Sequence, residues 1–223
     1  MTLLDLFDRL NGEAFAVLGQ HVIWSDMLGN ALGLAALALG WRRSVWSWPV
    51  QLLSGLVLIA AYVAAELGGG VGKQLIVIAV AVWGWNQWRR GGTGSGTGRI
   101  EVRFATGRER VLLLGGTAAG TLAVGTLFTV FPVLSWNPWP DAYIFVGTLA
   151  AMIAQARGWV EFWFAWLAVD LVGVPLALSS GLAFSGLVYG IYFVLVLLGL
   201  RTWWLTTRAP AAPTRTVPEG AAA

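Results

Sequence analysis

Aromatic and amide side chains gather at the end of an apolar stretch, in the segment Trp83–Arg90. Within it, Trp85 and Trp88 flank the amides Asn86 and Gln87. Flat indole faces beside amide donors and acceptors are what a site for a planar, polar heterocycle needs. Tryptophans followed by a pair of arginines are also typical of a membrane–water interface, so a purely interfacial role stays open for the same residues.

Two other apolar stretches carry similar combinations. Trp163, Trp166 and Asp170 have helical spacing and should share one face of a helix. A carboxylate in an apolar span is costly and usually faces an interior or a water-filled path. Asp170 therefore either faces a cavity with the two indoles, contacting substrate or controlling access, or it caps or pairs within the bundle. Trp48 and Gln51 place an indole and an amide in an earlier stretch.

The candidate substrate-binding residues share these aromatic, amide or carboxylate types. They are Trp48, Gln51, Trp85, Asn86, Gln87, Trp88, Trp163, Trp166 and Asp170. Further polar residues fall within or near the ends of the predicted spans, among them Asn30, Gln74 and Gln155.

The composition predicts an integral membrane protein. Of the 223 residues, 57% are hydrophobic and only 11% are charged, with a mean hydropathy of +0.72. A soluble domain carries about 25% charged residues. The absence of cysteine excludes disulfides and thiolate metal sites, and the single histidine, His21, argues against a histidine-rich metal centre. We therefore expect no metal or cofactor and, with so few groups able to catalyse a reaction, no enzyme.

The order of apolar and polar stretches predicts seven spans. The expected segments are an amphipathic lead at 1–22, a first three-helix bundle at 23–89, a cytoplasmic loop rich in glycine and arginine at 90–110, a linker helix at 111–131, a second three-helix bundle at 132–204 and a disordered cytoplasmic tail at 205–223. The lead is too polar to span; it should lie at the interface or form a short surface helix.

The positions of the basic residues indicate an orientation. With seven spans, Arg9 and Lys73 fall on one side of the membrane, and the other 12 of the 14 basic residues fall on the opposite side. Because cytoplasmic loops carry the excess of lysine and arginine, the N-terminus should lie outside and the C-terminus in the cytoplasm of the plasma (inner) membrane. The net charge of +3 then reflects topology, and we expect no nucleic-acid partner.

An internal repeat supports the same span count. A shift of 118 positions aligns glycines and tryptophans of the first three spans with those of the last three: Gly40-Trp41 with Gly158-Trp159, Trp48 with Trp166, Gly55 with Gly173, and Trp85 with Trp203. A single linker helix between the repeats makes both enter the membrane in the same direction. The expected fold is thus all-α, with seven transmembrane helices in two parallel three-helix bundles joined by a linker helix (3+1+3). This is the arrangement of the small sugar transporters called SWEETs, whose substrate site lies between the halves.

Three segments resemble the PnuC family of vitamin transporters. Trp83–Arg90 is similar to the family's aromatic-Gly-Trp-x-Gln-Trp signature, and Glu161–Asp170, followed by Pro175, is similar to its sixth span. Trp139–Ala142 resembles the entry to its fifth span. The resemblance covers roughly residues 23–204.

The resemblance implies uptake of a B-vitamin or its nucleoside across the bilayer. In the family, transport is thought to be facilitated diffusion, followed by trapping through a cytoplasmic kinase that need not contact the transporter. The segment from Phe15 to Asn30 resembles the riboflavin-transporting RibM/PnuX branch. We therefore expect riboflavin, with nicotinamide riboside or thiamine as the alternative. Proton-coupled transport, a non-transporting receptor and self-association of the chain stay open.

Overall fold

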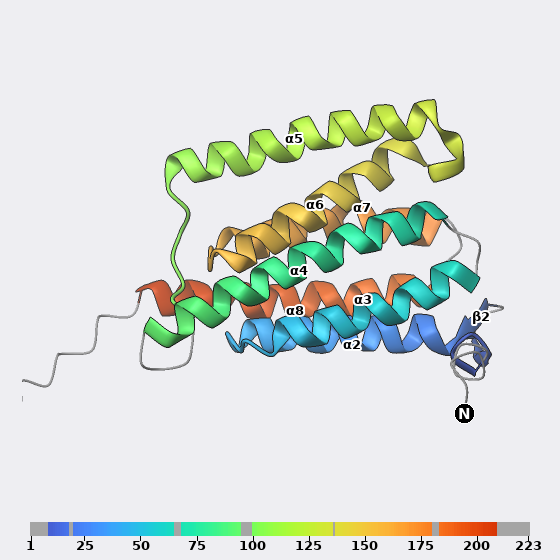
Figure 1. Ribbon diagram of the computed structural model, residues 1–223, viewed down its shortest axis with the longest axis horizontal. Coiled ribbons are helices and arrows are strands. Elements are labelled where there is room, and N and C mark those ends of the chain that lie inside the picture. Colours follow the sequence, from blue (N-terminus) through green and yellow to red (C-terminus); the bar gives the residue numbers. More distant parts are fainter. Residues whose placement is uncertain are drawn as a thin grey trace, which may run out of the picture.

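The computed structural model describes residues 9–17, 20–64, 68–94, 100–135, 137–179 and 183–208. In these residues seven α-helices run along one long axis, preceded by a small hairpin (Figure 1). The elements are β1 Glu13–Val17, β2 Gln20–Ile23, α2 Trp24–Trp41, α3 Ser47–Ala64, α4 Gly68–Gly94, α5 Gly107–Val130, the 3-10 turn η1 Pro132–Leu134, α6 Pro138–Ala156, α7 Glu161–Ser179 and α8 Ala183–Arg208. The expected set of seven helices is confirmed.

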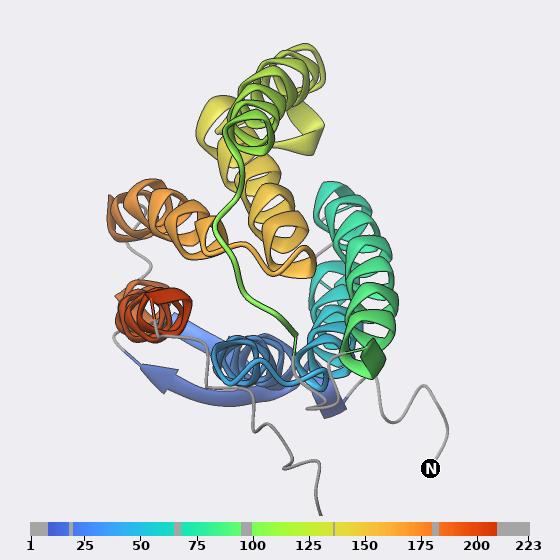
Figure 2. The ribbon, with the colours of Figure 1, turned by 90° about the vertical axis from the view of Figure 1, so that its left-hand side faces the viewer.

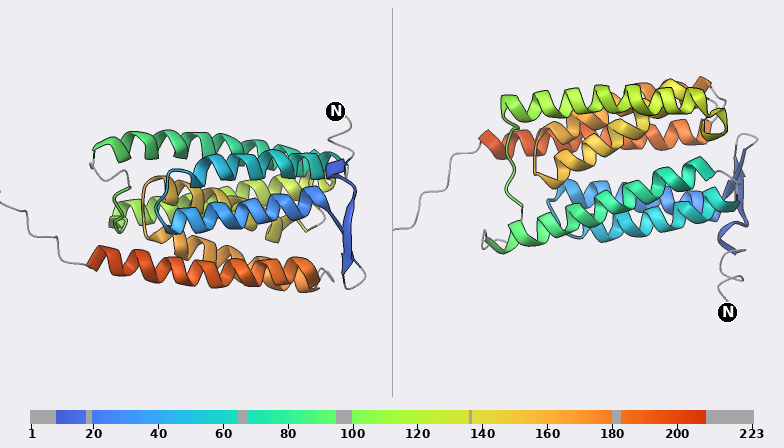
Figure 3. Two further views of the ribbon diagram at one scale, coloured as in Figure 1. Left: turned by 90° about the horizontal axis from the view of Figure 1, so that it is seen from below. Right: turned by 45° about the horizontal axis from the view of Figure 1, so that its top comes forward.

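The helices form two groups of three with one helix outside them. Helices α2, α3 and α4 pack together as a first half, and α6, α7 and α8 as a second half. Contacts between the halves run from α4 to α6 and from α2 to α8. Helix α5 packs on the outer side of α6, as Figures 2 and 3 show.

The outer surface is apolar where a soluble protein would be polar. On α5, Val111, Leu112 and Leu114 are 70%, 74% and 71% exposed. Contiguous exposed apolar surface of this kind marks contact with a membrane or another protein. Among the described residues, Gly107–Val130 and Gly190–Arg208 are long and apolar enough to cross a membrane by length and composition, and Met27–Trp41 and Ser47–Ala60 are shorter apolar helices.

The two halves repeat one packing motif. In the first half, the ring of Trp48 lies against Gly84 and meets Trp88 edge to face, with centroids 5.6 Å apart and planes at 85°. In the second half, Trp163 lies against Gly199 and meets Trp203 at 5.6 Å and 88°. Edge-to-face contact at this distance is a favoured aromatic geometry.

This motif corrects the repeat expected from the sequence. Each residue of the second motif follows its counterpart by 115 positions, so Trp48 corresponds to Trp163 and not, as the 118-residue shift predicted, to Trp166. The same offset relates the two described non-helical residues with positive φ, Arg43 (φ 58°) and Gly158 (φ 69°), which follow the ends of α2 and α6. The error was three residues, close to one helical turn, which keeps the same helix face and so preserves a similar pattern.

The start of the chain differs from the surface helix that was one of our expectations. Strands β1 and β2 pair as an antiparallel hairpin, in which Phe15 pairs with Val22 and Ala16 with His21. Val22 and Ile23 are β-branched, a type that favours strands. Just before the hairpin, Asn11 is bonded to the start of α2, where Ser25 Oγ donates to Asn11 Oδ1 at 2.8 Å. Residues 1–8 lie outside the described part of the chain.

The segment expected to be a loop at 90–110 is partly helical. Helix α4 continues to Gly94, and α5 begins at Gly107, where Thr106 and Glu109 form a capping box. Between them, residues 100–106 run along the ends of the second half (Figure 2). Arg103 N donates to Gly158 O, and Val160 N donates to Arg103 O, both at 3.0 Å. The predicted disordered tail at 205–223 begins too early, because α8 continues to Arg208. Residues 95–99 and 209–223 lie outside the described residues.

Replacing Gly84 or Gly199 by alanine is expected to destabilise the protein by about 1–3 kcal/mol, because a Cβ there would collide with the ring of Trp48 or Trp163. Gly115→Ala is the matched control: it also lies in a helix, and a Cβ there meets nothing within 4 Å. The measurement is thermal unfolding in detergent. Equal stability of all three variants would contradict the packing described for the two halves.

Candidate functional site

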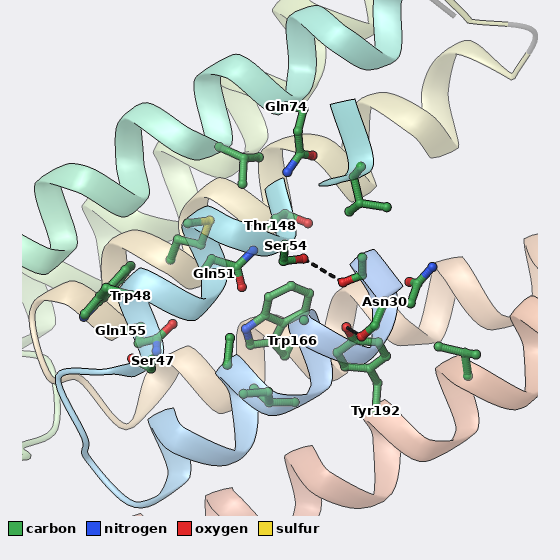
Figure 4. A pocket seen from close by; sticks show the side chains of 18 of the residues that line it. Asn30, Ser47, Trp48, Gln51, Ser54, Gln74, Thr148, Gln155, Trp166 and Tyr192 are labelled. Atoms are coloured by element: carbon green, nitrogen blue, oxygen red, sulfur yellow. Dashed lines mark hydrogen bonds between the residues drawn. The ribbon is translucent and has the colours of Figure 1, made fainter. Parts of the chain in front are cut away.

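A cavity of about 330 Å³ lies between the two halves (Figure 4). Small-molecule sites typically measure about 300–1,000 Å³. Helices α2, α3, α4, α6, α7 and α8 all contribute to its wall, and its main polar and aromatic lining residues are Asn30, Ser47, Trp48, Gln51, Ser54, Tyr62, Gln74, Thr148, Gln155, Trp166, Asp170 and Tyr192. The cavity therefore depends on both halves.

Part of the polar lining is held in place by backbone carbonyls. Ser54 Oγ donates to Gly29 O at 2.7 Å, which ties α3 to α2. Tyr192 OH donates to Asn30 O at 3.3 Å, which ties α8 to α2 across the two halves. The tyrosine hydroxyl lies where a Cβ on Gly33 would be, so glycine at this position lets α8 approach α2. These bonds fix the wall from which Asn30 projects (Figure 4).

Other polar atoms of the lining have no hydrogen-bond partner among the described residues. They are Ser47 Oγ, Trp48 Nε1, Trp166 Nε1 and Asp170 Oδ2. Buried polar groups in proteins are almost always hydrogen-bonded, so four such atoms around one cavity indicate a binding site. Three of them can donate, and Asp170 supplies a carboxylate acceptor that is 2% exposed. A flat ligand with acceptors on its ring and hydroxyl donors on a side chain would complement this set.

Four of the nine residues predicted from the sequence line the cavity. Trp48 and Gln51 come from α3, and Trp166 and Asp170 come from α7, so residues far apart in the sequence meet across the cavity. Of the three residues expected to share one helix face, Trp166 and Asp170 line the cavity and Trp163 does not.

The other five lie outside this lining. Trp85 is half-buried beneath the guanidinium of Arg89, at 5.7 Å, and Asn86 is exposed. Gln87 is half-buried next to them on α4. Trp88 and Trp163 are buried in the packing motifs at the end of the cavity.

Sequence reasoning left several lining residues without a role. Asn30, Gln74 and Gln155 were noted as polar residues in apolar spans, and that was the available signal. Thr148, Ser47 and Ser54 carry no comparable signal, because hydroxyl side chains often bond to the backbone of their own helix.

Charged residues cluster beyond one end of the cavity. Arg103 makes a bidentate pair with Glu109, at 2.8 and 2.7 Å, and this hydrogen bonding raises the pKa of the Arg103 guanidinium. Arg110 Nε pairs with Glu161 Oε1 at 2.7 Å, and Glu161 Oε2 also accepts from Ala105 N at 2.9 Å. The Arg103 pair joins the segment at 100–106 to the start of α5, and Glu161 joins both that segment and α5 to the start of α7. An exposed ion pair contributes little to stability by itself, so this attachment depends on all of these bonds together.

Comparison with known proteins gives consistent matches. The family described as nicotinamide mononucleotide transporter matches residues 23–205. The riboflavin/roseoflavin transporter RibM of Streptomyces davaonensis is 60% identical over 214 residues, covering 96% of this chain and 99% of that protein. The nicotinamide riboside transporter PnuC of Escherichia coli is 21% identical over 208 residues, covering 83% and 87%.

Among solved structures, the crystal structure of the vitamin B3 transporter PnuC has a similar fold, with a TM-score of 0.67 and 17% identity. The match covers 83% of this chain and 82% of that one. Since the family match spans most of the chain and a relative at 60% identity spans nearly all of it, this membrane protein belongs to the nicotinamide mononucleotide transporter (PnuC) family.

Proposed function

We propose that this protein takes up riboflavin through the cavity between its two halves. The observation that carries the proposal is the 60% identity, over almost the whole chain, to a protein named as a riboflavin/roseoflavin transporter. The cavity supports it, because its size and its mixture of indoles, amides and one carboxylate suit a flat heterocycle with a polyhydroxylated chain. Nicotinamide riboside, which the E. coli relative is named for, or thiamine is the alternative substrate.

In this proposal the isoalloxazine ring stacks on indole, and amides bond to its carbonyl and imide edge. Trp48, Gln51, Trp166 and Asp170 are assigned to ligand contact, because they line the cavity. Trp85, Asn86, Gln87, Trp88 and Trp163 act from outside the lining, at the end of the helices. The unpartnered carboxylate oxygen of Asp170 is a suitable acceptor for a ribityl hydroxyl.

The proposed membrane arrangement is 3+1+3, with all seven helices crossing the plasma membrane and α5 as the linker. Arg42 and Arg157 follow the ends of α2 and α6, Arg208 ends α8 and Arg89 lies in the last two turns of α4; these four helix ends lie at the same end of the bundle, here called the arginine-rich end. By the distribution of positive charge this end faces the cytoplasm, and the N-terminus lies outside. We further propose facilitated diffusion, with accumulation supplied by a cytoplasmic kinase that phosphorylates the vitamin.

Riboflavin binding by the purified protein is expected to quench flavin fluorescence saturably, because an indole stacked on the isoalloxazine ring donates an electron to the excited ring and so prevents its emission. Titration with riboflavin measures this, with nicotinamide riboside and thiamine as competitors. Failure of both competitors to reverse the quenching identifies riboflavin as the substrate. Absence of quenching, together with calorimetric binding of nicotinamide riboside, would leave the family assignment intact and reject riboflavin.

Gln51→Ala is expected to weaken riboflavin binding by up to about tenfold, since it removes one hydrogen-bonding group from the cavity. Trp166→Ala should weaken it at least as much, because it removes a stacking surface. Asn86→Ala is the matched control: an amide is removed from an exposed position on α4. If the Asn86 variant loses affinity and the Gln51 variant does not, the ligand binds near Trp85–Trp88 instead.

Uptake into proteoliposomes is expected to stop when riboflavin reaches the same concentration inside and outside, and to be unaffected by collapse of a pH gradient. The reason is that facilitated diffusion has no driving force other than the substrate gradient. Radiolabelled riboflavin measures the end point. Accumulation that depends on the pH gradient would support proton coupling, with Asp170 as its first candidate, and reject facilitated diffusion.

A further inference from the structure

At the arginine-rich end, each half donates an indole hydrogen bond to the other half. Trp88 Nε1, from α4, donates to Gln155 O at the end of α6, at 3.0 Å. Trp203 Nε1, from α8, donates to Trp41 O at the end of α2, at 3.1 Å. The two indoles are counterparts under the 115-residue offset, and each reaches a carbonyl in the last turn of the first helix of the opposite half.

The Trp88 bond lies where the cavity ends, and the Trp203 bond joins the two halves at the same end of the bundle. Gln155, whose backbone oxygen accepts from Trp88, also lines the cavity, as do Ser47 and Trp48. Figure 4 shows Ser47, Trp48 and Gln155 together at one side of the group. Trp48 is 1% exposed and Trp88 2%, while Trp163 and Trp203 are fully buried. All four rings are therefore buried, and Trp48 connects the cavity wall to Trp88.

The contacts within each half differ in kind from those between the halves. Within a half, each donating indole stands edge to face against a second indole, which in turn lies on a glycine. Between the halves, the same indole makes a single bond to a carbonyl at a helix end. Carbonyls at helix C-termini are readily satisfied by water, and Gln155 O keeps a second donor, Gly158 N, at 2.9 Å. Separating the halves here would break three indole hydrogen bonds, those of Trp88, Trp203 and Trp41, and would leave each half's packing intact.

We propose that Trp88 and Trp203 are the paired gate of the transporter, closing the cavity toward the arginine-rich end when their indole bonds form and opening it when both break. The proposal rests on the transport function proposed above, and it gives Trp88 a role other than ligand contact. Trp41 adds a third bond at the same end, from its Nε1 to Thr202 Oγ1 at 2.7 Å.

The chain contains no cysteine, so one introduced thiol reports access without background. Ser47→Cys places it beside Trp48 on the cavity wall, at a residue that is 1% exposed. The rate of labelling by a membrane-impermeant maleimide is measured in inverted membrane vesicles and in spheroplasts, without substrate. Trp88→Phe and Trp203→Phe are added singly and together, because phenylalanine keeps an aromatic ring and removes the N–H donor. Trp46→Phe, at a neighbouring residue that is 66% exposed, is the matched control.

Each single gate variant is expected to raise labelling in inverted vesicles by about three- to tenfold, the factor that one neutral hydrogen bond contributes, and the double variant should raise it further. The Trp46 control should not change the rate. The gate is overturned if labelling in the folded Trp88 and Trp203 variants is unchanged both in inverted vesicles and in spheroplasts. An increase in spheroplasts instead supports the gate and overturns the proposed orientation.

A purely structural role for the two indoles is tested in the same samples. It would lower the unfolding temperature without a side-specific change in labelling, and that result also overturns the gate. Size-exclusion chromatography identifies any variant that fails to fold, and the partner variant then carries the test, since it removes the other bond. Because no step uses riboflavin, a failure of the gate is distinguishable from a failure of the substrate assignment.

Discussion

The fold depends on an indole lying flat on a glycine once in each half. Trp48 on Gly84 and Trp163 on Gly199 bring α3 to α4 and α7 to α8 at a separation that no other residue at the glycine would permit. A large aromatic side chain is thereby buried completely at a helix–helix contact, where glycine allows close backbone approach and dispersion contacts accumulate. Trp88 and Trp203 pack against these two rings. Their indole N–H groups then reach the opposite half.

The cavity is polar inside a fold that is apolar outside. Exposed leucine and valine on α5 suit contact with lipid, whereas amides, hydroxyls and Asp170 face inward. In hydrocarbon a polar group without a partner costs more than in water, so such groups are kept where they serve a ligand or a path. The division of polar and apolar surface is therefore the physical basis for reading this helical bundle as a carrier.

Much of this was predictable from the sequence. The seven helices, their approximate bounds and the inward placement of Trp48, Gln51, Trp166 and Asp170 follow from apolar run length and helical spacing. The hairpin at 13–23 and the continuation of α4 to Gly94 were missed, because short strands and glycine-rich helix ends are set by tertiary contacts more than by local preference. Trp88 and Gln87 were predicted to bind substrate because of their residue types. Residue type alone does not distinguish a ligand contact from a structural contact near a helix end.

The offset between the two repeats was predicted wrongly by three residues. Tryptophans that match at a shift of 118 residues share only their residue type. The offset of 115 residues instead follows from the contacts between rings and glycines in the structure. With the correct offset, Gln51 corresponds to Trp166 and Gly55 to Asp170. The two halves are thus nearly symmetric in their tryptophan–glycine packing. Their residues on the two walls of the cavity, however, differ in chemical type. Such unlike walls favour a single orientation for any molecule with two chemically different ends that enters the cavity.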